Sequence, residues 1–127
     1  MELAGSVAVG LLTVIAVFQM ALALGAPYGK AAWGGAHDGV LPPRLRGASA
    51  LVGLVVYPAI IAVVLSASGL IEADLVPGDG AMTMWVLTTI FLLGAIANLV
   101  SRSRLERWWA GVSLTLAFCC GGMALGL

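Results

Sequence analysis

Four long apolar segments separated by short polar loops constrain this chain more than any other feature. They cover residues 4–26, 47–71, 81–100 and 108–127. A helix needs about 20 predominantly apolar residues to cross the hydrocarbon core of a bilayer, and each segment reaches that length. The chain is 61% hydrophobic and 9% charged, which is more apolar surface than a water-soluble core of this size can hide. We therefore expect an all-α integral membrane four-helix bundle that forms one transmembrane domain over residues 1–127.

The three loops differ in the sign of their charges. The first and third loops hold all the basic residues, which are Lys30, Arg44, Arg46, Arg102, Arg104 and Arg107. The second loop holds only acids, which are Glu72, Asp74 and Asp79. Because Lys and Arg near a membrane-spanning helix are retained on the cytoplasmic side, we predict cytoplasmic first and third loops and an N-out, C-out topology. The zero formal net charge argues against a nucleic-acid partner.

The first segment has a second interpretation as a secretory signal. Ala21-Leu22-Ala23 has the small-x-small form that a signal peptidase accepts. However, Glu2 is the only charge before the apolar run, and cleavage would require export of the basic first loop. We expect an uncleaved transmembrane helix.

Residues at the segment boundaries predict where the helices begin. Pro42 and Pro43 suit the first turn of the second helix, where the missing N–H costs nothing. Asp79 can cap the third helix. Ser103 and Glu106 match a capping box, in which each side chain accepts a hydrogen bond from the backbone N–H of the other residue.

Small residues predict the contact faces, because they let membrane helices approach closely. The expected inward faces are Ser49, Gly53 and Tyr57 on the second helix, Gly94 and Ala95 on the third, and Gly111, Thr115, Cys119, Gly122 and Gly126 on the fourth. Cys119 and Cys120 are interpreted as packing residues. We expect Trp85, Trp108 and Trp109 to be interfacial anchors.

Two amides lie within the apolar segments, where polar side chains are costly and often functional. Gln19 and Asn98 both fall in the half predicted to be cytoplasmic. In one interpretation they form a polar clasp between the first and third helices. In the other, they line a small cavity with Tyr57, next to a kink that we predict at Pro58.

The first loop, residues 27–46, is long and contains the only histidine. Tyr28 and Trp33 suggest that it lies partly in the membrane interface. His37 and Asp38 could form an acid–base pair, but no nucleophile accompanies them, and we expect no catalytic role. The composition provides no set of metal ligands, and we expect neither a metal nor a cofactor.

The chain resembles an uncharacterised group of small actinobacterial four-helix membrane proteins. The resemblance covers nearly the whole chain and rests on residues 25–29, 32–35, 41–42, 46–49, 98, 101–103 and 106–107. It implies a bacterial plasma membrane location and no known activity.

The polar residues near the predicted cytoplasmic face form the candidate site, which is Gln19, Trp33, His37, Tyr57, Asn98, Arg102 and Glu106. Arg102 and Glu106 are spaced to pair along one helix turn. We hypothesise that the first loop folds over this end and hydrogen-bonds to Asn98 or to the Arg102–Glu106 pair.

Two classes of function are consistent with the sequence. The first is a non-enzymatic accessory subunit or a binder of a small ligand or lipid, because no reactive constellation is present. The second is a small oligomeric carrier or channel with its site in the cytoplasmic half. Transport needs a polar path through the outer half, which offers only Ser6, Ser66, Ser68 and Thr83. The expected partners are the lipid bilayer and either another membrane protein or further copies of this chain.

Overall fold

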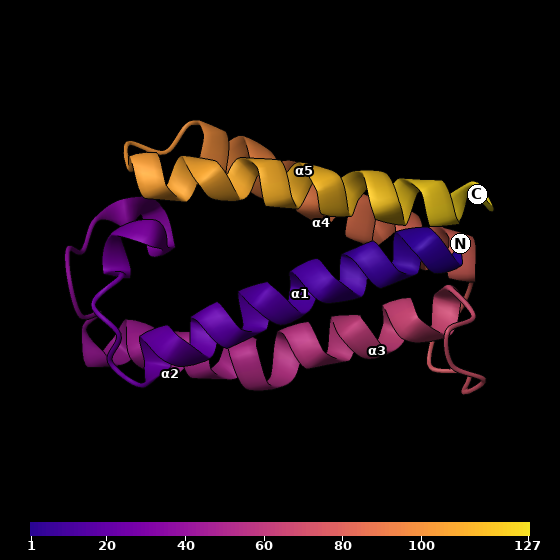
Figure 1. Ribbon diagram of the computed structural model, residues 1–127, viewed down its shortest axis with the longest axis horizontal. Helices are drawn as coiled ribbons and strands as arrows, with labels where there is room; N and C mark the ends of the chain where they lie inside the picture. The colour runs from indigo at the N-terminus through magenta and orange to yellow at the C-terminus, as the bar shows by residue number, and fades with distance from the viewer.

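The computed structural model describes all 127 residues, and its regular elements are helices. The long helical segments run alternately in opposite directions (Figure 1). Their bounds are α1 (Glu2–Ala23), the continuous run of α2 (Pro43–Leu51), η3 (Val52–Val56) and α3 (Tyr57–Ala67), then α4 (Gly80–Leu99) and α5 (Arg104–Ala124). The first loop adds two 3-10 turns, η1 (Gly29–Ala31) and η2 (Trp33–Gly35). The all-α prediction with four long helical segments is confirmed.

The two ends of the molecule differ in charge. The first and third loops lie together at one end, and the second loop lies with both termini at the other (Figure 1). We call the former the basic end, because it carries all six Lys and Arg residues, and the latter the acidic end, after Glu2, Glu72, Asp74 and Asp79.

Three of the four segments are long and apolar enough to cross a membrane. They are Glu2–Ala23, Pro43–Ala67 and Gly80–Leu99. The fourth, α5, has Arg104, Glu106 and Arg107 in its first turns, which leaves a shorter apolar stretch.

Three helices end a few residues before the predicted positions. At the end of α1, Gly25 adopts a left-handed φ of +102°, and the Ala26 N–H donates to the Ala21 carbonyl at 2.9 Å. Gly69 and Gly126, with φ of +76° and +79°, end α3 and α5 in the same way. This arrangement satisfies the last carbonyls and turns the chain away. The length of an apolar segment does not reveal this helix end, because apolar residues continue beyond the glycines.

The helix starts follow the predicted caps. Pro42 precedes α2 and Pro43 is its first residue, and Asp79 Oδ1 accepts from the Met82 N–H at 3.1 Å. Ser103 Oγ accepts from the Glu106 N–H at 3.4 Å. These caps are confirmed. Helices α2 and α5 begin four residues before the predicted apolar windows because their first turns are polar.

The perturbation predicted at Pro58 takes the form of a π-helical turn. The Tyr57 N–H donates to the Val52 carbonyl, five residues earlier, rather than to the residue four back. Proline has no N–H, and its ring would collide with the carbonyl of the residue four positions before it. The wider π turn relieves that collision.

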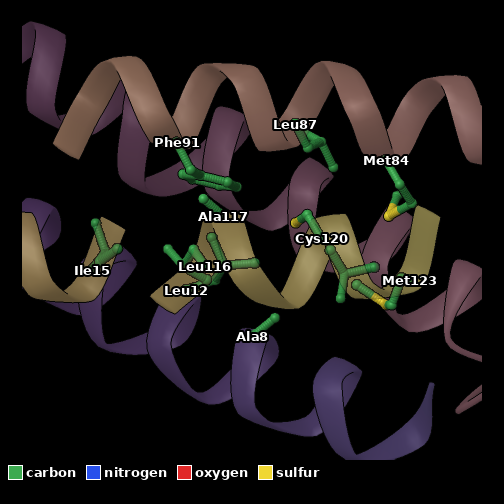
Figure 2. Packing of buried hydrophobic residues seen from close by; sticks show 11 residues of the cluster. Ala8, Leu12, Ile15, Met84, Leu87, Phe91, Leu116, Ala117, Cys120 and Met123 are labelled. Atoms are coloured by element: carbon green, nitrogen blue, oxygen red, sulfur yellow. The ribbon is translucent and has the colours of Figure 1, made fainter. Parts of the chain in front are cut away.

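The hydrophobic core fills the middle and the acidic half of the molecule. Helix α1 lies between α3 and α5 (Figure 1), and side chains from all four segments meet (Figure 2). The buried members are Ala8, Leu12, Ile15, Val64, Met84, Leu87, Phe91, Leu116, Ala117, Cys120 and Met123. No charged side chain belongs to this cluster.

The predicted small-residue faces have different outcomes. On α2 and η3, Ser49 and Gly53 are buried, and a Cβ on Gly53 would lie 3.1 Å from the Ala16 carbonyl oxygen. That face is confirmed.

The small face predicted on α5 is wrong. Gly111 and Thr115 are exposed, whereas Leu116, Cys120 and Met123 are buried. Larger side chains are needed here because they fill the space among the other helices. Cys120 is fully buried in the core, as its interpretation as a packing residue expects, and neither cysteine forms a disulfide.

Candidate functional site: a cavity beneath the first loop

A cavity of about 270 Å³ lies at the basic end, beneath the first loop. All four helical segments and the loop contribute to its wall. The lining residues are Ile15, Phe18, Gln19, Ala31, Ala32, Trp33, Val52, Tyr57, Asn98, Glu106 and Trp109. Five of the seven predicted site residues are among them, since only His37 and Arg102 lie outside the lining.

The first loop is a packed element that covers this end. The Gly29 N–H donates to the Gly39 carbonyl at 2.8 Å, which closes the loop on itself. Leu22, Ala32 and Leu41 form a small buried cluster between the loop and the end of α1. A Cβ on Gly29 would lie 2.7 Å from the Gly39 carbonyl oxygen, so this close approach requires glycine.

Three successive left-handed residues shape the part of the loop that faces the cavity. Trp33, Gly34 and Gly35 have φ of +51°, +83° and +70°. The left-handed conformation is free for glycine but costs energy at a bulky residue such as tryptophan. A Cβ on Gly35 would collide with the Ser103 side chain. The loop can therefore approach α5 this closely only with glycine at that position.

Hydrogen bonds to two helices hold Trp33 in this conformation. Its indole Nε1–H donates to Ser49 Oγ on α2 at 2.9 Å. The next residue, Gly34, donates its backbone N–H to Glu106 Oε1 on α5 at 3.1 Å. The Ser103 hydroxyl donates to the Lys30 carbonyl. Of the two alternatives, a hydrogen bond to Asn98 or to the Arg102–Glu106 pair, the loop hydrogen-bonds to Glu106, and it forms no hydrogen bond to Asn98 or Arg102.

Glu106 has a different role from the two predicted for it. Its Oε2 accepts from the Ser101 hydroxyl at 3.0 Å, while the Ser103 N–H donates to Ser101 Oγ at 3.1 Å. The reciprocal half of the capping box is therefore wrong. The pairing with Arg102 is also wrong, because both carboxylate oxygens are bonded to neutral donors and Arg102 is exposed.

The position of Glu106 in the first turn of α5 stabilises its negative charge. Glu106 is 9% exposed and its carboxylate lies where the unpaired N–H groups of the helix make the local potential positive. No Lys or Arg belongs to the wall of the cavity, so Glu106 has no basic partner there.

Gln19 and Asn98 face the same cavity without meeting. Gln19 Oε1 is buried and has no hydrogen-bond partner in the protein, so the predicted clasp between α1 and α4 is not formed. A buried acceptor without a partner costs about 1–3 kcal/mol.

Aromatic and apolar residues complete the wall, and most of them are not among the residues predicted from the sequence. Phe18 and Trp109 stack with ring centroids 5.0 Å apart and planes tilted by 43°. Trp109 is thus partly buried against Phe18, whereas Trp85 and Trp108 are 46% and 76% exposed. The signal lay in helical spacing, because Ile15, Phe18 and Gln19 share one face of α1 and Glu106 shares a face of α5 with Trp109.

The two predicted residues outside the lining are His37 and Arg102, and Arg102 is exposed between α4 and α5. His37 lies in the first loop, where its carbonyl packs against Gly29. The chain contains no group of three or more His, Cys, Asp or Glu side chains placed to hold a metal ion. The arrangement offers hydrogen-bond acceptors, one carboxylate and aromatic faces, which is the chemistry of a binding site.

Comparison of the chain with models of protein families, with curated proteins and with solved structures gave no match.

Proposed function

We propose that this chain is a multi-pass membrane protein, N-out and C-out, that binds a small amphipathic molecule at its cytoplasmic end without transforming it. One observation carries the binding function. Gln19 belongs to the wall of a cavity to which all four helical segments contribute, and its buried Oε1 has no partner in the protein. A purely structural amide would be expected to find a partner, because almost all buried polar groups are hydrogen-bonded.

The proposed topology is supported by the arrangement of the loops. Both basic loops lie at one end of the molecule (Figure 1), as retention of Lys and Arg on the cytoplasmic side requires. Helix α5 has 21 residues, or about 30 Å at the rise of an α-helix, and packs against α4. We infer that it is the fourth span of a bundle. The resemblance to small actinobacterial membrane proteins agrees with a bacterial plasma membrane.

Exposed tryptophans agree with this placement. Trp85 lies near the start of α4 at the acidic end, Trp108 lies near the start of α5 at the basic end, and both are exposed. Such amphipathic rings are enriched at the two interfaces of a bilayer.

The alternative function, a carrier or channel, receives less support. The acidic half is filled by apolar side chains, and the hydroxyls there are bonded locally. Thr83 donates to the Pro77 carbonyl, Ser68 to the Leu65 carbonyl and Ser66 to the Ala73 carbonyl. A single copy of the chain therefore offers no polar path from the cavity to the opposite end.

Binding can be tested with three probes that share a phenylethyl group and differ in the polar head. They are phenethylamine, 2-phenylethanol and phenylacetate. We expect at least one to raise the melting temperature of the detergent-solubilised protein. Gln19→Leu should reduce that rise at the same probe concentration, and Thr89→Val should retain it, because Thr89 is exposed and bonds only within its own helix. Absence of any rise with all three probes would contradict the binding function.

The topology has a separate test. A reporter that is active only in the cytoplasm, fused after Leu127, should be inactive, and a reporter active only outside the membrane should be active. The reverse pattern would place the cavity on the outer side.

A further inference from the structure

We propose that the ligand of this cavity is a protonated primary amine attached to an apolar group. The ammonium would be held by the Glu106 carboxylate and Gln19 Oε1, among the aromatic rings of the wall. This inference rests on the proposed binding function and specifies the ligand class.

The charge of the wall provides the first argument. Glu106 is the only charged side chain in the lining, and no Lys or Arg belongs to it. Each of its oxygens accepts one hydrogen bond from a neutral donor, and each carboxylate oxygen can accept a second. A buried carboxylate is most favourable opposite a cation. A cationic ligand supplies that partner, and an anionic ligand would be repelled.

Gln19 provides the second argument, which concerns hydrogen bonding. Its buried Oε1 is an acceptor and needs an N–H or O–H donor from the ligand. A quaternary ammonium carries the charge but has no N–H, and an alcohol has the donor without the charge. A protonated amine has both, and its three N–H groups can serve Glu106 and Gln19 together.

The aromatic residues provide the third argument. Phe18, Trp33, Tyr57 and Trp109 all belong to the lining. Aromatic faces attract cations within about 6 Å of the ring centre, and the same rings offer apolar contact to the carbon part of an amphipathic ligand. Ile15 and Val52 extend the apolar part of the wall.

The size of the cavity limits the ligand. Its volume of about 270 Å³ lies just below the range of about 300–1,000 Å³ for pockets that hold drug-sized molecules. Two sources of the same chemistry fit this size. One is a soluble arylalkyl or alkyl amine, and the other is the ethanolamine headgroup of a phospholipid.

The ligand class is tested by measuring the dissociation constants of the three phenylethyl probes for the wild-type protein in detergent. We expect phenethylamine to bind at least about tenfold more tightly than 2-phenylethanol, because the alcohol loses a hydrogen bond between charged groups. Phenylacetate should bind most weakly. Equal or tighter binding of the alcohol or the acid would overturn the amine assignment while leaving the binding function intact. Failure of all three to bind would contradict the binding function itself.

Glu106→Gln gives a sharper form of the test. This variant retains an acceptor of nearly the same size, and it should reduce the preference for the amine over the alcohol to about threefold or less, since the charge on the acceptor is lost. An unchanged preference would overturn the role of Glu106. If the variant fails to fold, Gln19→Leu replaces it, because it should weaken amine binding by about tenfold through loss of one hydrogen bond. Unchanged amine binding in that variant would overturn the assignment.

The source of the amine is distinguished by native mass spectrometry of the protein from bilayers that contain equal amounts of phosphatidylethanolamine and phosphatidylcholine. Preferential retention of phosphatidylethanolamine, displaced by phenethylamine, would support the lipid headgroup. Equal retention of the two lipids, together with amine binding in detergent, would support a soluble amine. Preferential retention of phosphatidylcholine would contradict the requirement for N–H donors.

Discussion

The basic and acidic ends of the molecule satisfy their polar groups in different ways. At the basic end, hydrogen bonds join residues that are 16, 72 and 73 positions apart, through Trp33–Ser49, Gly34–Glu106 and Lys30–Ser103. At the acidic end, the side-chain hydrogen bonds of the second loop and its flanking helices span no more than nine residues. The basic end is thus built by tertiary contacts, whereas the acidic end needs only local ones.

This difference is relevant to function. Local hydrogen bonds close a loop between two helices and leave the interior to apolar packing. The long-range bonds of the basic end hold a loop above a space that is not filled, and they leave Gln19 Oε1 without a partner. An end assembled in this way can keep a cavity open at the expense of stability.

The largest expected effect is the loss of the Glu106 carboxylate. Glu106→Ala leaves the Gly34 N–H and the Ser101 hydroxyl without their acceptor, and should reduce the free energy of unfolding in detergent by about 3 kcal/mol. The change in the free energy of unfolding is measured by thermal or denaturant unfolding, with circular dichroism as the signal. Glu106→Gln should cost about half as much, because one acceptor oxygen remains.

Arg102→Ala is the matched control, because Arg102 was predicted to pair with Glu106 and is instead exposed. It should change the free energy of unfolding by less than about 0.5 kcal/mol. A loss of stability as large as that of Glu106→Ala would indicate that Arg102 and Glu106 form an ion pair. It would contradict the hydrogen bonds of Glu106 to Gly34 and Ser101.

The next effect concerns the link between the first loop and α2. Trp33→Ala removes a side chain that is 39% exposed together with its bond to Ser49, and should destabilise the protein by about 2 kcal/mol. Trp33→Phe keeps most of the ring and should lose about 1 kcal/mol. Equal stability of both variants and the wild type would show that the loop is not held by this residue.

Gln19→Leu should change stability in the opposite direction. It replaces a buried acceptor without a partner by an apolar side chain of similar size, and we expect a gain of about 1 kcal/mol in the absence of ligand. The unfolding measurement used for Glu106 applies. A loss of similar size would indicate that Gln19 is bonded within the protein, as the clasp interpretation requires.

The smallest effect is expected at the acidic end. Ser66 Oγ donates to the Ala73 carbonyl at 2.6 Å and accepts from the Leu75 N–H at 3.0 Å, and all three groups belong to an exposed part of the chain. Ser66→Ala should cost less than about 1 kcal/mol, because water can replace the lost bonds. A larger loss of stability would indicate that hydrogen bonds stabilise the second loop as strongly as the first.

Much of the fold was predictable because it depends on local patterns. Apolar length predicted the four helical segments, and Asp79 and Ser103 predicted the starts of α4 and α5 through bonds that span only three residues. The ends of α1 and α3 were misplaced, because a left-handed glycine stops a helix regardless of the apolar residues that follow it.

The candidate site was predictable as a set of residues and much less as a set of contacts. Costly polar side chains in apolar segments identified Gln19 and Asn98, and the long loop identified Trp33. Their partners did not follow, because Glu106 has two competing local acceptor roles in the sequence and takes neither. The contact face of α5 was predicted wrongly for a related reason. The side chain that packs in the core there is Cys120, and its neighbours come from distant segments of the chain.

By itself, the sequence determined the helical class, the number of long segments and the sorting of basic and acidic loops to opposite ends, since these follow from apolar length and from charge along the chain. Only the tertiary structure decided that the first loop covers the basic end, that Glu106 bonds to Gly34 across 72 positions and that Gln19 is left facing a cavity. The reason is physical. Hydrogen bonds between distant residues are selected by the relative placement of whole helices, and no short stretch of sequence encodes that placement.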